Sequence, residues 1–209
     1  MVGRIIETEA DVAEGAAWLA ARVPCFAAAL ARTGPLPLRR REDGFAALFG
    51  AIVSQQVSVA AASAIWARLS AIGATDPAIL PSLPDAALRT AGLSRQKIAY
   101  GRALATSGID FAALRTQPTD EVVAALVEVK GIGVWTAEIY AMFSLGRADV
   151  FAPGDLALQD AARLLFGLEA RPGEPALRAM SAEWSPWRAV AARLLWAYYR
   201  MARGREGVR

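Results

Sequence analysis

The chain has 209 residues, of which 55% are hydrophobic, so it is long enough to bury a sizeable core as one domain or as two small lobes. It contains no histidine and a single cysteine, Cys25. This excludes a Ser-His-Asp triad, a histidine-ligated metal site, an internal disulfide and a four-cysteine cluster. The formal net charge is +3, which is compatible with a nucleic-acid partner but is weak evidence for one by itself.

The first half of the sequence predicts helices joined by connectors that contain proline and glycine. The composition is rich in alanine and arginine, with no long alternation of apolar and polar residues, and this favours a mainly helical fold. We expect helices over residues 11–30, with a break at Pro24, and over residues 45–69, with a polar interruption at residues 54–56. An arginine-rich connector, residues 33–44, separates them.

Shorter helices are expected in the middle of the chain, over residues 77–80, 84–91 and 94–107. The polar start of the last one, Ser94-Arg95-Gln96-Lys97, is interpreted mainly as a solvated helix start and secondarily as a DNA contact. Thr119 is the expected N-cap of the helix that follows.

In the last third, we expect helices over residues 135–145 and 155–166 and a final helix that ends near Met201. Ser185 and Pro186 fit the N-cap and first-turn positions of this final helix. Residues 203–209 are expected to be frayed.

The most informative motif is Gly131-Ile132-Gly133, which lies between two helical segments. Glycine adopts positive φ angles without steric cost, so this pair predicts a tight reversal of the chain. The first backbone N–H groups of the next helix then have no partner within that helix, and such groups bind phosphate well.

A second motif places Asp155 directly after Pro153-Gly154, at the start of a helix. Asp is among the best N-cap residues, so a purely structural role is the simplest interpretation. The same carboxylate could also stabilise positive charge on a sugar ring as a glycosidic bond breaks, and could orient a water molecule toward the anomeric carbon.

The tryptophans allow two interpretations. Core packing is expected for Trp18 and Trp66. Trp135 and Trp196 suit an aromatic wall around a flipped base, because an indole face attracts a cationic base.

Three further features of the sequence each allow two interpretations. The segment from Trp184 to Arg188 is either a second phosphate site or a capped helix with a solvated arginine. The group Ser54-Gln55-Gln56 is either a surface interruption of an apolar helix or a set of polar groups that face a DNA duplex. Lys130 contacts either phosphate or water.

Together, these residues resemble the 3-methyladenine DNA glycosylase II group within the helix-hairpin-helix DNA glycosylase superfamily. The resemblance covers roughly residues 44–199. It is carried by five motifs in the family's order: AIVSQQVSVAAASAIW, GLSRQKIAYGRALA, GIGVWTAEIYAM, DVFAPGDLALQDA and WSPWRAVAARLLW.

The resemblance implies that Asp155 is the catalytic carboxylate and that the amides of Gly131 and Gly133 hold the DNA backbone. Trp135 and Trp196 match aromatic residues of the base pocket. The other implied pocket residues are Ile139 and Leu156, which stand where some members have tyrosines, and the other implied DNA-binding residues are Gln55, Gln56, Ser58, Lys130, Thr136, Trp187 and Arg188.

Some of these positions carry more specific roles in the family. Gln56 matches the wedge that fills the gap left by a flipped nucleotide. Trp135 stands where bifunctional relatives carry a Schiff-base lysine, so a monofunctional hydrolase is implied. The family also implies a structural Na⁺ or K⁺ bound by the carbonyls of Val127, Val129 and Ile132, with no cofactor required for catalysis.

The resemblance predicts an all-α, two-lobe fold with a helix-hairpin-helix motif and a cleft between the lobes. Residues 1–43 are expected to form an N-terminal segment of the same globule, and residues 44–209 the glycosylase core, without a separate β-rich domain. We expect a monomeric cytoplasmic protein, associated with the nucleoid and not with a membrane, whose partner is double-stranded DNA.

The expected activity is excision of alkylated purines such as 3-methyladenine, which leaves an abasic site. An alkylated base is already cationic and needs little protonation to leave, which fits a chain without histidine. Two alternatives are a glycosylase for an oxidised or deaminated base, and a helix-hairpin-helix DNA-binding module without catalysis.

Overall fold

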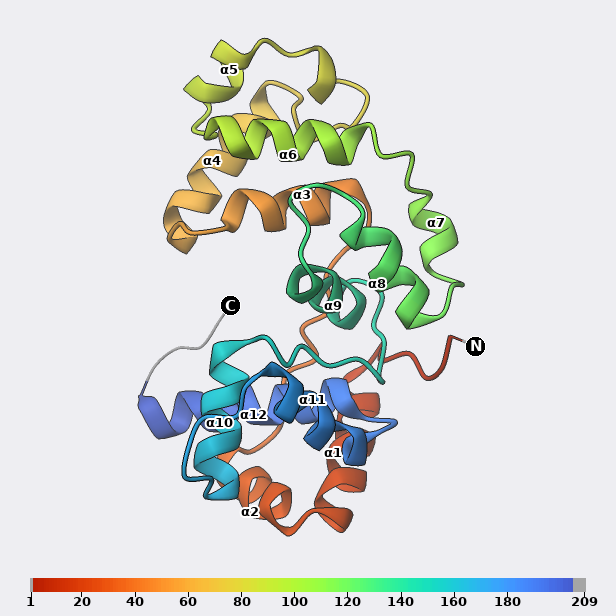
Figure 1. The fold of residues 1–209 in the computed structure, drawn as a ribbon, viewed down its shortest axis with the longest axis vertical. Coiled ribbons are helices and arrows are strands. Elements are labelled where there is room, and N and C mark those ends of the chain that lie inside the picture. Colours follow the sequence, from red (N-terminus) through yellow and green to blue (C-terminus); the bar gives the residue numbers. More distant parts are fainter. Residues whose placement is uncertain (1, 205–209) are drawn as a thin grey trace. The chain divides into compact units, whose positions relative to one another are not determined.

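The structure is a computed structural model that describes residues 2–204 (Figure 1). Over this range the chain is built from helices, and the only β feature is an isolated bridge between Ile5 and Arg147. The prediction of an all-α fold is confirmed. Most of the segment expected to be frayed, residues 205–209, lies outside the described residues. Within residues 2–204, no helix combines the length and the apolar character that crossing a bilayer requires.

The contacts between residues divide the chain into two compact units. The first unit comprises residues 1–40 and 141–209, and the second comprises residues 41–140. One division therefore falls within helix α9 (Val134–Phe143), and the other falls in the arginine-rich connector.

The first unit packs its helices around an aromatic cluster. Phe166 stacks on Trp184 at 5.9 Å between ring centroids, and Phe26 meets Trp184 edge-on at 5.2 Å. Helix α12 contacts α1, α2 and α10, so it forms the centre of the unit. The helices are α1 (Glu9–Arg22), α2 (Pro24–Thr33), α10 (Leu156–Phe166), α11 (Glu174–Ser181), the 3-10 helix η2 (Ala182–Trp184) and α12 (Arg188–Arg203).

The second unit is organised around α3 (Phe45–Ser54) and α6 (Arg95–Ala105), which pack against each other. A Cβ atom added at Gly101 of α6 would lie 2.6 Å from the Phe49 ring, so glycine permits this close approach. Phe49 also packs against Phe45 and Trp66. The remaining helices are α4 (Val59–Ala71), the 3-10 helix η1 (Leu80–Ser82), α5 (Asp85–Thr90), α7 (Phe111–Leu114) and α8 (Thr119–Val127).

Two predicted helix starts were wrong. Thr119 is the first residue of α8, and the N-cap is Pro118, which makes no side-chain cap bond. The last helix begins at Arg188 and not near Ser185, because the Ser185 hydroxyl donates to the Asp149 carboxylate at 2.9 Å. The Ser185 backbone N–H donates to the Ala182 carbonyl, and this bond closes a turn before the helix.

The prediction for residues 77–80 was also inaccurate, because turns precede the short 3-10 helix η1 there. The Asp76 carboxylate accepts the Ala78 N–H at 2.8 Å. Such a local bond offers the backbone an alternative to helix formation. The short helices α7 and α11 were not predicted.

Candidate functional site

In the first unit, Asp155 is the N-cap of α10, as the Pro-Gly turn predicts. Its Oδ1 atom accepts the Leu158 N–H at 3.0 Å and the Trp196 Nε1–H at 3.2 Å. The residue is only 7% exposed. The carboxylate is therefore held in one orientation by a backbone donor and an indole donor.

The turn that leads to Asp155 is fixed as well. The Gln159 side-chain amide donates to the Pro153 carbonyl at 2.8 Å, and the Asp155 N–H donates to the Ala152 carbonyl at 3.0 Å. Gln159 lies on α10 itself, so the helix supports the turn that precedes it. A catalytic group needs this kind of support to hold its geometry.

Trp196 lies on α12 and is 4% exposed. Its ring packs against Phe143, with centroids 5.8 Å apart and planes inclined by 31°. Sequence reasoning placed Trp196 near the base pocket but missed its bond to Asp155. The structure directly supports a positioning role for Trp196, because its indole N–H holds the Asp155 carboxylate.

Arg193, one turn before Trp196, is a buried cation that the sequence analysis did not single out. It donates to the Leu38 and Ala189 carbonyls, and its guanidinium lies 4.8 Å from the centre of the Phe143 ring. Burial, with a smaller effect from Arg39 and Arg40, lowers the pKa of Arg193 to about 9. This arginine anchors the α12 face that carries Trp196.

The segment from Trp184 to Arg188 does not match the interpretation of a capped helix with a solvated arginine, because no side chain caps α12. Its role as a second phosphate site stays a prediction. Arg188 donates to the Asp149 carboxylate at 2.6 Å, so it is not a solvated arginine. Trp187 is buried, and a Cβ atom added at Gly15 would lie 2.5 Å from its ring. The Trp187 ring is therefore part of the core, and a DNA contact of this residue stays a prediction.

In the second unit, residues 131–133 form the predicted reversal between α8 and α9, here called the glycine hairpin. Gly131 has a φ angle of 98°, and a Cβ atom added there would lie 2.3 Å from the Tyr100 ring. A Cβ atom added at Gly133 would meet nothing within 4 Å. Gly131 is thus required by the fold, whereas Gly133 faces open space.

Two other predicted DNA-binding residues near the glycine hairpin differ in accessibility. Lys130 is exposed at the turn. Thr136 is buried, so its side chain is unavailable and only its backbone remains as a contact group. The side-chain part of that prediction is corrected.

Residues 55–58, here called the polar loop, join α3 to α4. Gln56 is exposed and has a φ angle of 57°, in the left-handed region that residues other than glycine rarely adopt. The Gln55 amide donates to the Gly131 carbonyl at 3.3 Å, which connects the polar loop to the glycine hairpin. Ser58 caps α4 by accepting the Ala61 N–H.

A polar cavity of about 430 Å³ opens between the polar loop, the glycine hairpin and the start of α6. Sequence reasoning gave the α6 residues only a secondary role, although GLSRQKIAYGRALA was among the motifs of the resemblance. The cavity is lined by Gln55, Gln56, Ser94, Gln96, Lys97, Tyr100, Gly131, Ile132 and Gly133.

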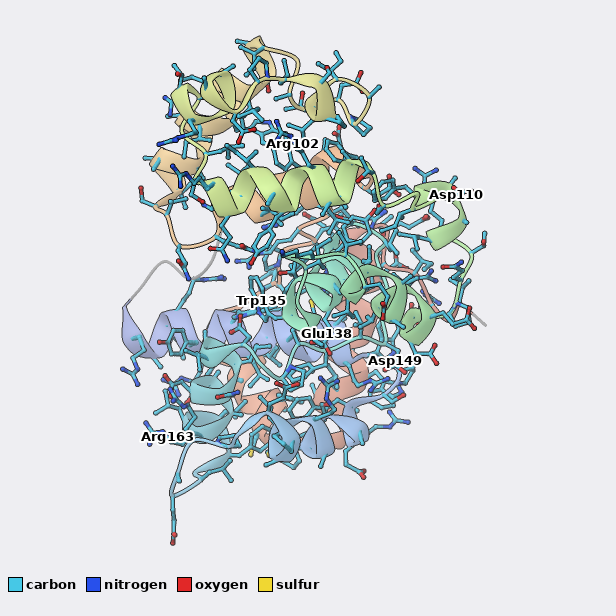
Figure 2. All side chains as sticks on the ribbon, turned by 45° about the horizontal axis from the view of Figure 1, so that its top comes forward. Arg102, Asp110, Trp135, Glu138, Asp149 and Arg163 are labelled. Atoms are coloured by element: carbon cyan, nitrogen blue, oxygen red, sulfur yellow. The ribbon has the colours of Figure 1, made fainter. Side chains whose placement is uncertain are left out.

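Helix α9 carries the predicted base-pocket residues of the second unit. Trp135 is 39% exposed, and it lies one turn from Glu138 on the same helix (Figure 2). Ile139 is partly buried. In the first unit, Leu156 follows Asp155 and is 61% exposed. Trp135 and Leu156 are therefore both exposed apolar side chains, one in each unit.

The chain belongs to the HhH-GPD superfamily of base excision DNA repair proteins, whose family model matches residues 49–186. A solved DNA-3-methyladenine glycosidase from Bacillus halodurans is 36% identical, with a TM-score of 0.80. The similarity covers 89% of this chain and 88% of that one. DNA-3-methyladenine glycosylase 1 of Schizosaccharomyces pombe is 28% identical over 171 residues, which are 78% of this chain and 75% of the relative.

A structure of Schizosaccharomyces pombe 3-methyladenine DNA glycosylase in complex with abasic DNA shares the fold. Its TM-score is 0.75 at 24% identity, over 91% of this chain and 97% of that one. The chain spans 43% of the length of a related Bacillus subtilis protein, which it matches at 31% identity over 124 residues.

Proposed function

We propose that this protein is a monofunctional DNA glycosylase of base excision repair. It hydrolyses the N-glycosidic bond of alkylated purines such as 3-methyladenine and leaves an abasic site. The observation that carries the proposal is the buried Asp155 carboxylate, bonded to the Leu158 N–H and the Trp196 Nε1–H. Membership of a base excision repair family and similarity to the Bacillus halodurans glycosidase support it.

The chemistry requires an anion beside the sugar. As the bond between C1′ and the base nitrogen breaks, the base leaves with the bonding electrons and positive charge develops on the sugar ring. The Asp155 carboxylate stabilises that charge, and a water molecule adds to C1′ and releases a proton. The alkylated base is cationic before the reaction and neutral after it, so no histidine is needed to protonate it.

DNA binding is assigned to the second unit. The backbone N–H groups of Gly131 and Gly133, with those of the first turn of α9, bind a phosphate. Gln56, exposed on the polar loop, fills the space of the extruded nucleotide. Trp135 stacks on the flipped base, since an exposed indole favours a cationic ring. Ile139 is proposed as a further base contact of the second unit, and Leu156 as a base contact of the first unit.

The remaining features follow from the same proposal. The tryptophan at position 135 replaces the lysine that forms a Schiff base in bifunctional relatives, so the enzyme hydrolyses the bond without strand cleavage. It acts as a monomer on DNA of the cytoplasmic nucleoid.

A monovalent cation is proposed at the glycine hairpin. Neutral backbone carbonyls suit Na⁺ or K⁺, and the proposed ligands are the carbonyls of Val127, Val129 and Ile132. The Val129 carbonyl accepts the Ile132 N–H at 3.0 Å, which leaves its second lone pair for the ion. Among the described residues, no group of His, Cys, Asp or Glu side chains forms a metal site.

The substrate class is tested with a set of duplexes, each with one lesion: 3-methyladenine, 7-methylguanine, 8-oxoguanine or uracil. We expect release of the two alkylated bases, measured as free base and as alkali-labile abasic sites. Borohydride is expected to trap no covalent complex, because position 135 carries a tryptophan and not the lysine that would form a Schiff base. Release confined to 8-oxoguanine or uracil would contradict the alkylated-base assignment.

Trp196→Phe tests the indole bond to the carboxylate. Phenylalanine retains the aromatic contact with Phe143 but has no N–H for Asp155. Since hydrogen bonds to charged groups contribute about 1.5–3 kcal/mol, we expect single-turnover base release to fall roughly 10- to 100-fold. Affinity for undamaged DNA is expected to stay at the native level. Native release rates in the variant would show that the indole N–H does not position Asp155.

A further inference from the structure

Lys97 makes an unusual set of contacts for a lysine near a proposed DNA-binding surface. Its Nζ atom donates to the Val53 and Gln55 carbonyls, both at 2.7 Å. These carbonyls belong to the C-terminal end of α3 and the first residue of the polar loop. Two of its three ammonium donors are thus directed at the protein backbone, where a cation suits the negative end of a helix.

The polar loop is held from a second side by the glycine hairpin. The Gln55 side chain donates to the Gly131 carbonyl, while its own carbonyl accepts from Lys97. Tyr100 lies one turn after Lys97 on α6 and packs against Gly131. One face of α6 therefore supports both the polar loop and the glycine hairpin.

Gln56, the residue directly after these contacts, has the positive φ angle of 57°. A residue other than glycine adopts this conformation only when the surrounding structure enforces it. The contacts to Gln55 lie directly before this residue in the chain. Partial burial also lowers the pKa of Lys97, which is consistent with an ammonium group withdrawn from solvent into these contacts.

We propose that Lys97 is a positioning residue that fixes the backbone of Gln56, and thereby gives the protein its preference for DNA with an extruded nucleotide over intact DNA. This inference rests on the proposed function of Gln56 as the wedge. Lys97 acts through the Val53 and Gln55 carbonyls and not through a phosphate. Its loss should therefore affect selectivity and leave general DNA affinity unchanged.

The test compares affinities for two duplexes, one intact and one with a tetrahydrofuran abasic-site analogue, over a range of salt concentrations. For Lys97→Met, which retains the aliphatic stem, we expect the preference for the analogue to fall about tenfold, because two charge-assisted bonds are lost. Affinity for the intact duplex and its salt dependence should stay native. Lys97→Arg, which retains charge and donors, should keep most of the preference.

Lys130→Met is the matched control, because Lys130 is the chain's other lysine and is exposed at the glycine hairpin. Loss of a phosphate contact there should weaken binding to both duplexes equally and reduce the salt slope by about one. If Lys97→Met behaves in this way, Lys97 is a phosphate contact and the proposal is wrong.

A double-mutant cycle with Gln56→Ala separates positioning from general stability. If Lys97 acts through Gln56, Lys97→Met should have little further effect on the preference in the Gln56→Ala background. Additive losses would overturn the proposal, as would an unchanged preference in Lys97→Met. These binding measurements need no base release, so failure of the glycosylase assignment is detected separately by the lesion experiment.

Discussion

Asp155→Asn is expected to lose most base release while the protein stays folded and binds DNA. The asparagine Oδ1 can still accept the Leu158 N–H and the Trp196 Nε1–H, so the N-cap is retained. The negative charge is removed, however, and loss of one preorganised electrostatic group lowers rates about 100- to 1,000-fold. Single-turnover release of 3-methyladenine, measured beside a DNA-binding isotherm, checks both halves of this expectation.

Asp155→Ala is the matched variant that separates catalysis from stability. It removes the N-cap, which contributes about 1 kcal/mol, and leaves the buried Trp196 N–H without its acceptor, which costs about 1–3 kcal/mol more. We expect similar inactivity in both variants but a lower melting temperature only for alanine. If Asp155→Asn releases base within a few-fold of the native rate, Asp155 is a structural N-cap and not the catalytic group.

The second large effect is expected for Gly131→Ala, which should destabilise the protein by about 3 kcal/mol or more. The φ angle of 98° is unfavourable for alanine, and the added methyl group would overlap the Tyr100 ring. The glycine hairpin or α6 must therefore shift. Urea unfolding of the variant measures the loss, and its DNA affinity should fall at the same time.

Gly133→Ala provides the control within the same hairpin. A methyl group there meets no protein atom within 4 Å, so the unfolding free energy should remain native. DNA affinity should still fall, because the methyl group lies beside the amides proposed to bind phosphate. Equal loss of stability in both variants, or native DNA affinity in Gly133→Ala, would contradict the role assigned to this hairpin.

The parts of the site that were predictable from sequence depend on local chemistry. The Pro-Gly turn before Asp155 and the paired glycines at 131 and 133 each specify a backbone reversal within a few residues. The N-cap role of Asp155 was predicted for this reason, and α10 runs to Phe166 as expected.

The parts that were missed depend on contacts between distant residues. The Trp196 bond to Asp155 joins positions 41 residues apart, and Lys97 reaches carbonyls more than 40 residues before it. Ser185 failed as an N-cap because its hydroxyl bonds to Asp149, 36 residues away. Local preference identifies groups able to form a bond, and only the tertiary structure decides which partner they take.

We propose that this chain hydrolyses the glycosidic bond of alkylated purines in DNA. The most direct measurement is chromatography of the free bases released when the native protein is incubated with methylated duplex DNA. We predict release of 3-methyladenine, with strands that stay intact until alkali is added. Stable binding to the same duplex without release of any base would contradict the claim and would identify a DNA-binding module without catalysis.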